Sequence, residues 1–360
     1  MAVSRINEAG LNVNQYGNRN LIINGAMKVA QRGTSSTGLG ASAGYFTVDR
    51  YNSAFSGTAG RLTMTQDSSA PSGFANSVKL DVTTADTSVA AGEYFIFQQR
   101  IEGQNLQQFA KGTSDAKPFA VSFYVKGNAS ATYVAELYDS DNSRHINKTF
   151  SVTTDWTRVE LFFSADTTGA FNDDNASSLE LNIWLHAGTN FTSGSLQTTW
   201  GTTSQTSRAV GISSIFDSTD RTFFLTGVQL EVGDTATDFE HRTFDDELRR
   251  CKRYFESKSF TTFVEIGYSN GTTSAHCILP YLEKRAAPTV TLPTAGQSTN
   301  QLTFRTPTGS NPSTTGSNTA YDLTTTQGRI QGASYAGLTA GGVSSLYLNG
   351  TASIKFDAEL

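Results

Sequence analysis

Two short polar stretches bring carboxylates close together, and paired carboxylates are the groups that hydrolyse glycosidic bonds. They are DSDN at 139–142, with Asp139 and Asp141, and NDDN at 172–175, with Asp173 and Asp174. Glycan hydrolysis needs two such groups about 5–9 Å apart beside a cleft. Both stretches also contain the Asn, Asp and Ser residues that are typical of turns. Turn chemistry is the simpler interpretation, and we expect a protein that is not an enzyme.

The same oxygen-rich stretches could instead hold a structural calcium ion. Calcium binds carboxylate and carbonyl oxygens, but neither stretch has the twelve-residue EF-hand pattern with Gly at its sixth position. Calcium therefore stays an alternative to solvated turns, and no other cofactor is predicted.

Histidine and cysteine are too few and too scattered to predict a metal centre or a nucleophile. The four histidines lie far apart, at His145, His186, His241 and His276, without HxH or HExxH spacing. Cys251 and Cys277 form no CxxC pair, and we expect both to be buried as small apolar side chains. The chain also lacks a G-x-S-x-G elbow, a P-loop and a dinucleotide-binding glycine motif.

Aromatic side chains offer a different chemistry, because their rings stack on sugar rings while polar neighbours bond to hydroxyls. Trp156 and Trp184 lie in strand patterns and are expected in the core, whereas Trp200 lies in a polar loop and could stack on a ligand. Near the C-terminus, four residues have side chains suited to a glycan or protein receptor: Tyr335, Tyr321, Arg305 and Asn349. Tyr335 lies in GASYAGLTAGG, where little side-chain bulk would hide it. Ordinary turn and strand positions are the alternative for each.

Short strands must position these residues. Strand-like runs recur from NLIINGAMKVAQRG to FFLTGVQLEV, including FTVDRY, YFIFQQRI, FAVSFYVKG, TYVAELYD, LELNIWLHA and AVGISSIFDS. In FAVSFYVKG the residues Phe119, Val121, Phe123 and Val125 share one face, and Tyr133, Ala135 and Leu137 do so in TYVAELYD. About ten such strands predict an all-β fold, with a large antiparallel jelly-roll sandwich over residues 20–241.

A helical period follows, and we predict a linking helix over residues 242–258. Thr243 can cap it, with Asp246 in capping-box position. Its apolar stripe comprises Phe244, Leu248, Cys251 and Phe255. The stripe could pack beneath the sandwich or contact symmetry mates in an oligomer.

Two further regions complete the expected organisation. Residues 259–360 contain about six strand-like runs and predict a smaller C-terminal β-domain, with an exposed loop at 306–326. Residues 1–19 are polar and interrupted by Gly10 and Gly17, so we read them as an arm that orders against a partner or as a frayed terminus.

The charge balance excludes some classes of partner. The chain has 360 residues, a net charge of -5 and only 16% charged residues, without a Lys/Arg run. Such a surface does not favour nucleic acid. The N-terminal segment does not resemble a secretory signal, and no run of about 18 apolar residues occurs, so we expect synthesis in a cytoplasm and no membrane insertion.

Four segments carry a resemblance to a known group of proteins. They are NLIINGAM with VDRY, DWTRVELFFSAD, TTW with RAVG, and FFLTGVQLEVGDTATDFEHRTFDDELRRCKRYFE, and KRAAPTVTLP extends the likeness to about residue 293. These segments resemble bacteriophage tail fibre or minor structural virion proteins, in which a jelly roll similar to carbohydrate-binding modules ends in a GVQLEVG strand and a helix. Trp200 matches a Trp of that group, which ties it to the shared scaffold.

The resemblance implies a homotrimeric virion protein, made in the host cytoplasm, whose distal part meets the host. We expect a non-enzymatic part of the tail fibre or receptor-binding apparatus. Its arm would bind other virion proteins, and its C-terminal domain a host-surface glycan or protein. The alternative is a structural virion component, such as a head decoration, collar or adaptor protein. A depolymerase and a free carbohydrate-binding module are further alternatives.

Overall fold

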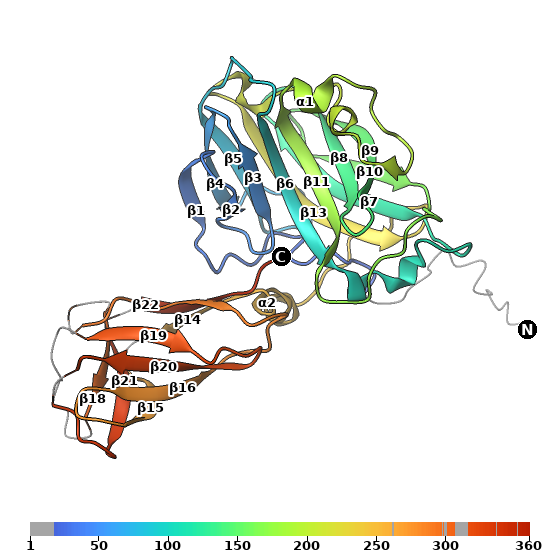
Figure 1. Cartoon of the computed structure of the whole chain (residues 1–360). Helices are drawn as coiled ribbons and strands as arrows, with labels where there is room; N and C mark the ends of the chain where they lie inside the picture. The colour runs from blue at the N-terminus through green and yellow to red at the C-terminus, as the bar shows by residue number, and fades with distance from the viewer. Residues whose placement is uncertain are drawn as a thin grey trace, which may run out of the picture. The chain divides into compact units, whose positions relative to one another are not determined.

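The protein forms two compact β-rich units (Figure 1). The computed structural model describes residues 18–260, 263–296, 298, 301–306, 316–335, 337–350 and 352–360. Unit 1 ends at Glu247 and also includes Leu360, while unit 2 spans Leu248–Glu359. The boundary between the units therefore falls within the helix α2, Phe244–Lys252.

Unit 1 is an antiparallel sandwich of two sheets. The six-stranded sheet has the order β1 (Ser35–Leu39), β4 (Arg61–Asp67), β5 (Ser77–Thr84), β13 (Thr222–Val232), β7 (Phe119–Gly127) and β10 (Thr157–Phe163). The seven-stranded sheet has the order β12 (Gly201–Thr202), β9 (Arg144–Val152), β8 (Ala131–Asp139), β11 (Ser177–Ala187), β6 (Tyr94–Glu102), β3 (Asn52–Ser56) and β2 (Gly44–Tyr45). The chain crosses between the sheets repeatedly, for example from β5 to β6 and on to β7. The predicted all-β, jelly-roll fold class is confirmed.

The core lies between the two sheets, and strand alternation fills it. The residues predicted to share a core face are all buried, both Phe119, Val121, Phe123 and Val125 on β7 and Tyr133, Ala135 and Leu137 on β8. Alternate residues of each strand therefore face away from the core, and on the seven-stranded sheet this outward set carries the polar and aromatic groups described below.

Three runs with strand-like sequence are not strands. NLIINGAMKVAQRG buries Ile22, Met27 and Val29 but is irregular, because Asn24 and Met27 take left-handed backbone conformations, with φ of 61° and 55°. FTVDRY is likewise irregular, and AVGISSIFDS contains only the short 3-10 helix η5, Ile215–Asp217. Apolar content placed these segments in the core, but left-handed and turn conformations keep them out of the ladders.

The linking helix is shorter than predicted. Its cap is confirmed, since Thr243 Oγ1 accepts from the Asp246 amide at 3.3 Å, but α2 ends at Lys252 and the strand β14 begins at Phe255. The chain turns at Arg253 and Tyr254 and enters β14, whose hydrogen bonds to β22 compete with continuation of the helix. Across the described residues, the helices are all too short or too polar to cross a bilayer.

Unit 2 consists of two antiparallel sheets. The three-stranded sheet contains β14 (Phe255–Phe260), β22 (Ala352–Asp357) and β17 (Thr289–Thr291). The six-stranded sheet has the order β18 (Gln301–Arg305), β21 (Val343–Asn349), β15 (Phe263–Ser269), β16 (Ala275–Pro280), β20 (Gln327–Ala333) and β19 (Ser317–Tyr321). Unit 2 has a hydrophobic core of its own, whose buried members include Leu302, Phe304, Ile330, Leu346 and Phe356. A C-terminal β-domain was predicted, but β19 lies within the stretch expected to be an exposed loop.

Candidate functional site

The register of neighbouring strands creates a row of polar groups on the outer face of the seven-stranded sheet. Glu180 of β11 lies opposite Tyr138 of β8 on one side and Arg100 of β6 on the other. Trp184, four residues along β11, lies opposite Ile96 of β6. Since residues of the same parity share a face, β6, β8 and β11 together present polar and aromatic side chains on one surface.

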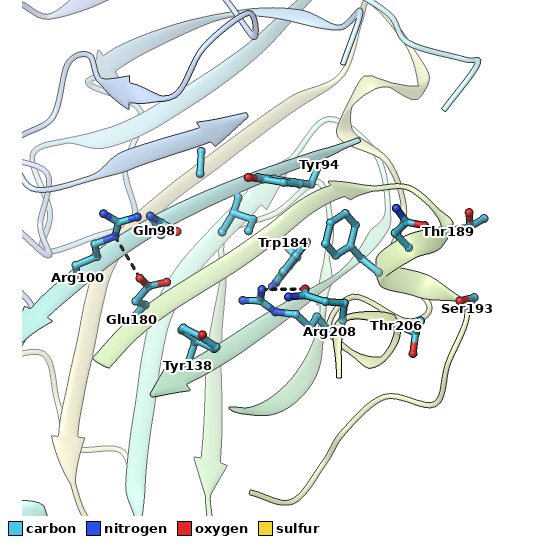
Figure 2. A pocket seen from close by; sticks show the side chains of 15 residues that line it. Tyr94, Gln98, Arg100, Tyr138, Glu180, Trp184, Thr189, Ser193, Thr206 and Arg208 are labelled. Atoms are coloured by element: carbon cyan, nitrogen blue, oxygen red, sulfur yellow. Dashed lines mark hydrogen bonds and ion pairs between the residues drawn. The ribbon is translucent and has the colours of Figure 1, made fainter. Parts of the chain in front are cut away.

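A pocket of about 870 Å³ lies on this surface. Ligand pockets are typically about 300–1,000 Å³, so the volume suits a small molecule or a short oligosaccharide. Figure 2 shows its strand residues beside the segment that carries Thr189, Ser193 and Thr206. The lining residues are Ala54, Tyr94, Ile96, Gln98, Arg100, Tyr138, Glu180, Trp184, Thr189, Asn190, Phe191, Ser193, Gln205, Thr206 and Arg208.

Three aromatic rings form the apolar end of the pocket. Tyr94 packs edge-on against Phe191 at 5.4 Å and against Trp184 at 6.1 Å, and Trp184 lies 5.3 Å from Phe191. Trp184 is fully buried, whereas Tyr94 and Phe191 are partly exposed. The aromatic surface exposed in the pocket is therefore that of Tyr94 and Phe191, and Trp184 packs beneath it.

A buried carboxylate fixes the cationic side of the pocket. Glu136 of β8 accepts two hydrogen bonds from Arg208, at 2.8 and 2.7 Å, one from Asn182 at 2.9 Å and one from the Trp184 indole at 3.0 Å. Burial would raise the pKa of Glu136, but Arg208 and the other donors outweigh it and hold the pKa below its ordinary value. The Arg208 guanidinium lies 4.9 Å from the rings of both Tyr138 and Trp184. It is thus held in place, with 12% of its side chain exposed.

A second carboxylate lies closer to the solvent. Glu180 forms an ion pair with Arg100, at 3.3 Å, and these side chains are 15% and 33% exposed. Burial raises the pKa of Glu180, although Arg100 opposes the shift. The Asn182 amide reaches both carboxylates, at 2.9 Å from Glu136 and 3.4 Å from Glu180.

The wall of the pocket is the segment 188–209, which backbone hydrogen bonds attach to the sandwich. Gly188 donates to the Glu93 carbonyl at 2.8 Å, and Asn190 donates to the Ala91 carbonyl at 2.9 Å. Gly188 is required for this approach, because a Cβ there would lie 2.0 Å from the Ala90 carbonyl oxygen. The wall is therefore fixed at its base.

The pocket has the composition of a binding site for a polar, ring-containing ligand. Tyr94 and Phe191 offer ring surfaces, while Arg100, Arg208 and Glu180 offer charged hydrogen-bonding groups. Of the two carboxylates, Glu136 already accepts four hydrogen bonds from protein donors. It is a positioning residue for Arg208, so the pair does not have the arrangement of an acid and a free nucleophile.

The prediction that Tyr335 is an exposed contact is wrong. Its side chain is fully buried, its hydroxyl donates to Asn318 at 2.9 Å, and its ring packs edge-on against Phe304. A Cβ at Gly316 or Gly332 would lie 2.8 or 2.5 Å from this ring. The small neighbours thus let the ring enter the core instead of leaving it uncovered.

The other predicted contacts of unit 2 lie on its six-stranded sheet. Tyr321 on β19 is 43% exposed, with the Arg329 guanidinium 5.7 Å from its ring. Arg305 on β18 is half-buried, and its guanidinium lies 4.5 Å from the Tyr347 ring. Asn349 ends β21, and its side chain lies outside the described residues. Tyr321 therefore remains a candidate contact, and Arg305 is engaged by an aromatic ring.

Trp200 lies outside the pocket and packs against the sandwich. Its indole donates to the Ser164 carbonyl at 2.7 Å, and its ring lies 5.7 Å from Phe119. This matches the scaffold role that the resemblance implies. Trp184 is fully buried as expected, but in a separate cluster with Ile96, Val134 and Ala209 on the outer face of the seven-stranded sheet and not between the sheets. Trp156 is only half-buried, against Phe224.

The predicted oligomer stripe does not form one helical face. Phe244 is 53% exposed and Leu248 is partly buried, but Cys251 is fully buried and Phe255 is a buried residue of β14. Within the described residues neither cysteine forms a disulfide, and both are buried, as expected. Burial raises the pKa of Cys277 to about 12, so it is no nucleophile at neutral pH.

The two acidic stretches do lie side by side, but protein donors occupy them. Asp139 accepts from the buried Lys111 ammonium at 2.5 Å, and Asp141 accepts from the Asn172 amide groups at 2.9 and 3.0 Å. Lys111 also lies 3.1 Å from Asp166. A lysine thus takes the position that a cation would need beside Asp139, which favours the turn interpretation over calcium.

Sequence reasoning missed the pocket, although one signal was present. In YFIFQQRI the residues Tyr94, Gln98 and Arg100 share the parity opposite to the buried Phe95 and Phe97. An outward strand face with one aromatic and two hydrogen-bonding side chains indicates a binding surface. The neighbouring strands that complete it could not be identified without the register.

Comparisons with known proteins give only distant structural likenesses. Neither the protein-family models nor the curated proteins contain a match. Among solved structures, the chain is similar to the enzymatically active domain of bacteriophage CBA120 tailspike protein 4, with 14% identity and a TM-score of 0.31 over 59% of this chain. The chain spans 21% of that tailspike chain.

Two further likenesses are to carbohydrate-binding modules. TmCBM61, in complex with β-1,4-galactotriose, has 9% identity and a TM-score of 0.32, with 59% of this chain and 99% of the module covered. The family 11 module from Clostridium thermocellum, in complex with a β-1,3-1,4-mixed-linked tetrasaccharide, has 10% identity and a TM-score of 0.27, with 58% and 98% covered. At these TM-scores the likenesses assign no ligand to this chain, and its jelly-roll class rests on its own sheets.

Proposed function

We propose that unit 1 binds a host-surface glycan in the pocket and holds it without cleaving it. The observation that carries this proposal is one pocket that combines the exposed ring surfaces of Tyr94 and Phe191 with the charged groups of Arg100, Glu180 and Arg208. Sugar rings have apolar faces and hydroxyl edges, and these groups match both. Binding without cleavage follows because Glu136 is committed to Arg208, Asn182 and Trp184.

The setting that we propose is a bacteriophage virion, in its tail fibre or receptor-binding apparatus. The GVQLEVG closing strand and the helix that follows support it through the resemblance to such proteins. Residues 1–19 would attach the protein to other virion proteins, and residues 1–17 of this arm lie outside the described residues. A homotrimer is part of this proposal, and light scattering against the monomer mass of 38.7 kDa tests it.

Glycan arrays and host-cell binding test the proposed site. The full-length protein should bind one class of oligosaccharide and coat the host cells. Arg100→Ala should weaken glycan binding by about tenfold or more, since a hydrogen bond to a charged group contributes about 1.5–3 kcal/mol. Tyr94→Ala should also weaken it, because it removes a ring surface on which a sugar could stack. Tyr321→Ala is the control in unit 2 and should leave glycan affinity unchanged.

Other outcomes would favour the other functions. Loss of cell coating in Tyr321→Ala alone would assign the receptor contact to unit 2. Binding to purified tail or capsid, without binding to glycans or cells, would favour a head decoration, collar or adaptor protein. Release of reducing ends from host polysaccharide would show a depolymerase and refute the proposal of binding without cleavage.

A further inference from the structure

A second cluster of polar groups is buried at one end of the sandwich. Asp86 follows β5, Glu93 precedes β6, and His186 lies near the end of β11. One potential ligand atom from each residue lies within 4.8 Å of the others, and all three residues are buried. Residues of these types are usually exposed unless they are paired or hold a metal.

Two atoms of the cluster face each other without a hydrogen bond. His186 Nε2 and Glu93 Oε2 are 3.6 Å apart, and among the described residues neither has a hydrogen-bond partner. The His186 side chain is 0% exposed and that of Glu93 10%. Leaving a buried ring nitrogen and a buried carboxylate oxygen without hydrogen bonds costs folding free energy, unless an ion or another ligand binds between them.

An irregularity in β11 points His186 toward this cluster. Trp184 of β11 pairs with Ile96 of β6, and the next pair is His186 with Phe95. The strand β11 therefore advances by two residues where β6 advances by one. This is a β-bulge, and bulges re-aim side chains and are common beside functional sites. The imidazole consequently lies 5.4 Å from the Phe216 ring in the core, away from Trp184 and the pocket.

Outer contacts hold the three groups in place, as they do around metal sites. His186 Nδ1 is 2.7 Å from Ser214 Oγ, which leaves Nε2 to face the carboxylates. Asp86 Oδ2 accepts from the Thr58 hydroxyl at 2.7 Å and from the Ala59 amide at 2.8 Å. Burial lowers the pKa of His186, while Asp86 and Glu93 oppose the shift.

We propose that His186, Glu93 and Asp86 form a structural site for a divalent transition-metal ion, with zinc as the ion to test. One imidazole nitrogen and two carboxylates are ligands that zinc accepts, whereas calcium and magnesium prefer oxygen alone. Atoms bound to zinc at about 2.0–2.1 Å in a tetrahedron are about 3.4 Å apart, close to the 3.6 Å between His186 and Glu93. The Asp86 ligand oxygen lies within 4.8 Å of the other two ligand atoms, and a water would complete the tetrahedron.

Sequence spacing could not predict this site, since the residues come from three separate segments. A bound ion would join the 86–93 loop to β11. Because the Glu93 carbonyl also accepts from Gly188, the ion would stabilise the base of the pocket wall. The site does not depend on what the pocket binds.

Zinc titration of EDTA-treated full-length protein tests the proposal. We expect one zinc ion per chain by calorimetry and a higher melting temperature with zinc. Glu93→Gln preserves shape and should weaken zinc binding by more than about a hundredfold, because loss of even an outer contact of a metal ligand costs about 10–100-fold. His186→Gln should do the same, while His241→Gln, which removes an exposed histidine, should bind zinc like the wild type.

Cobalt provides a readout that does not depend on the variants. The wild type with Co²⁺ should show the visible absorption of a nitrogen- and oxygen-bound ion, even if a variant fails to fold. Three results would overturn the proposal: no zinc binding by the wild type, zinc binding that survives both Glu93→Gln and His186→Gln, or stabilisation by calcium but not by zinc.

Discussion

Replacing the buried Glu136 with glutamine should strongly destabilise unit 1. The carboxylate accepts four hydrogen bonds at 2.7–3.0 Å and balances the charge of Arg208. Glutamine keeps the shape but removes the charge and turns one acceptor into a donor that faces other donors. Breaking a buried ion pair by removing one partner costs about 3–5 kcal/mol. Because Arg208 is 12% exposed, we expect a loss near the lower value, about 3 kcal/mol.

Urea unfolding followed by tryptophan fluorescence measures this loss in unit 1 alone. All three tryptophans, Trp156, Trp184 and Trp200, belong to that unit, so unfolding of unit 2 does not contribute to the signal. Glu160→Gln is the matched control, since Glu160 is a 40% exposed strand residue. Its effect should stay within about 0.5 kcal/mol.

A double-mutant cycle separates the ion pair from other causes. Arg208→Met combined with Glu136→Gln should cost clearly less than the sum of the single changes, because coupled residues in one network show interaction energies of about 0.5–3 kcal/mol. A Glu136→Gln loss below about 1 kcal/mol, or additive single changes, would refute the role assigned to the network.

Three further predictions use similar measurements. The pKa of Glu136 in the folded protein is held below 4.5. The ionised carboxylate therefore stabilises the fold fully above pH 4.5, and this contribution is lost as the pH falls through the folded-state pKa. The stability difference between wild type and Glu136→Gln should shrink in acid, and a constant difference would contradict this. Lys111→Met should destabilise unit 1 by about 3–5 kcal/mol in urea unfolding, because it leaves the buried Asp139 without its cation, whereas Asp166 keeps its ion pair with Arg144; a loss like that of an exposed lysine would refute it. Tyr335→Phe should lower the stability of unit 2 by about 1 kcal/mol in calorimetry without changing host-cell binding, and weaker cell binding would return Tyr335 to the contact surface.

The sequence alone determined the all-β class, the inward faces of β7 and β8 and the cap of α2. These features depend on local periods, since alternate residues of a strand face opposite sides and a cap lies within one helical turn. Thr243 and the buried set from Phe119 to Val125 could therefore be read directly from the chain.

Only the tertiary structure decided which outward residues meet. Glu180 lies between Tyr138 and Arg100 because β11 pairs with β8 and β6 in one register, and a slip of one residue would turn its side chain to the other face. Burial in glycine-rich segments is also a tertiary property, as Tyr335 illustrates: small neighbours left room for its ring in the core. A site built from distant strands is set by pairing and packing, and these are fixed only when the whole sheet forms.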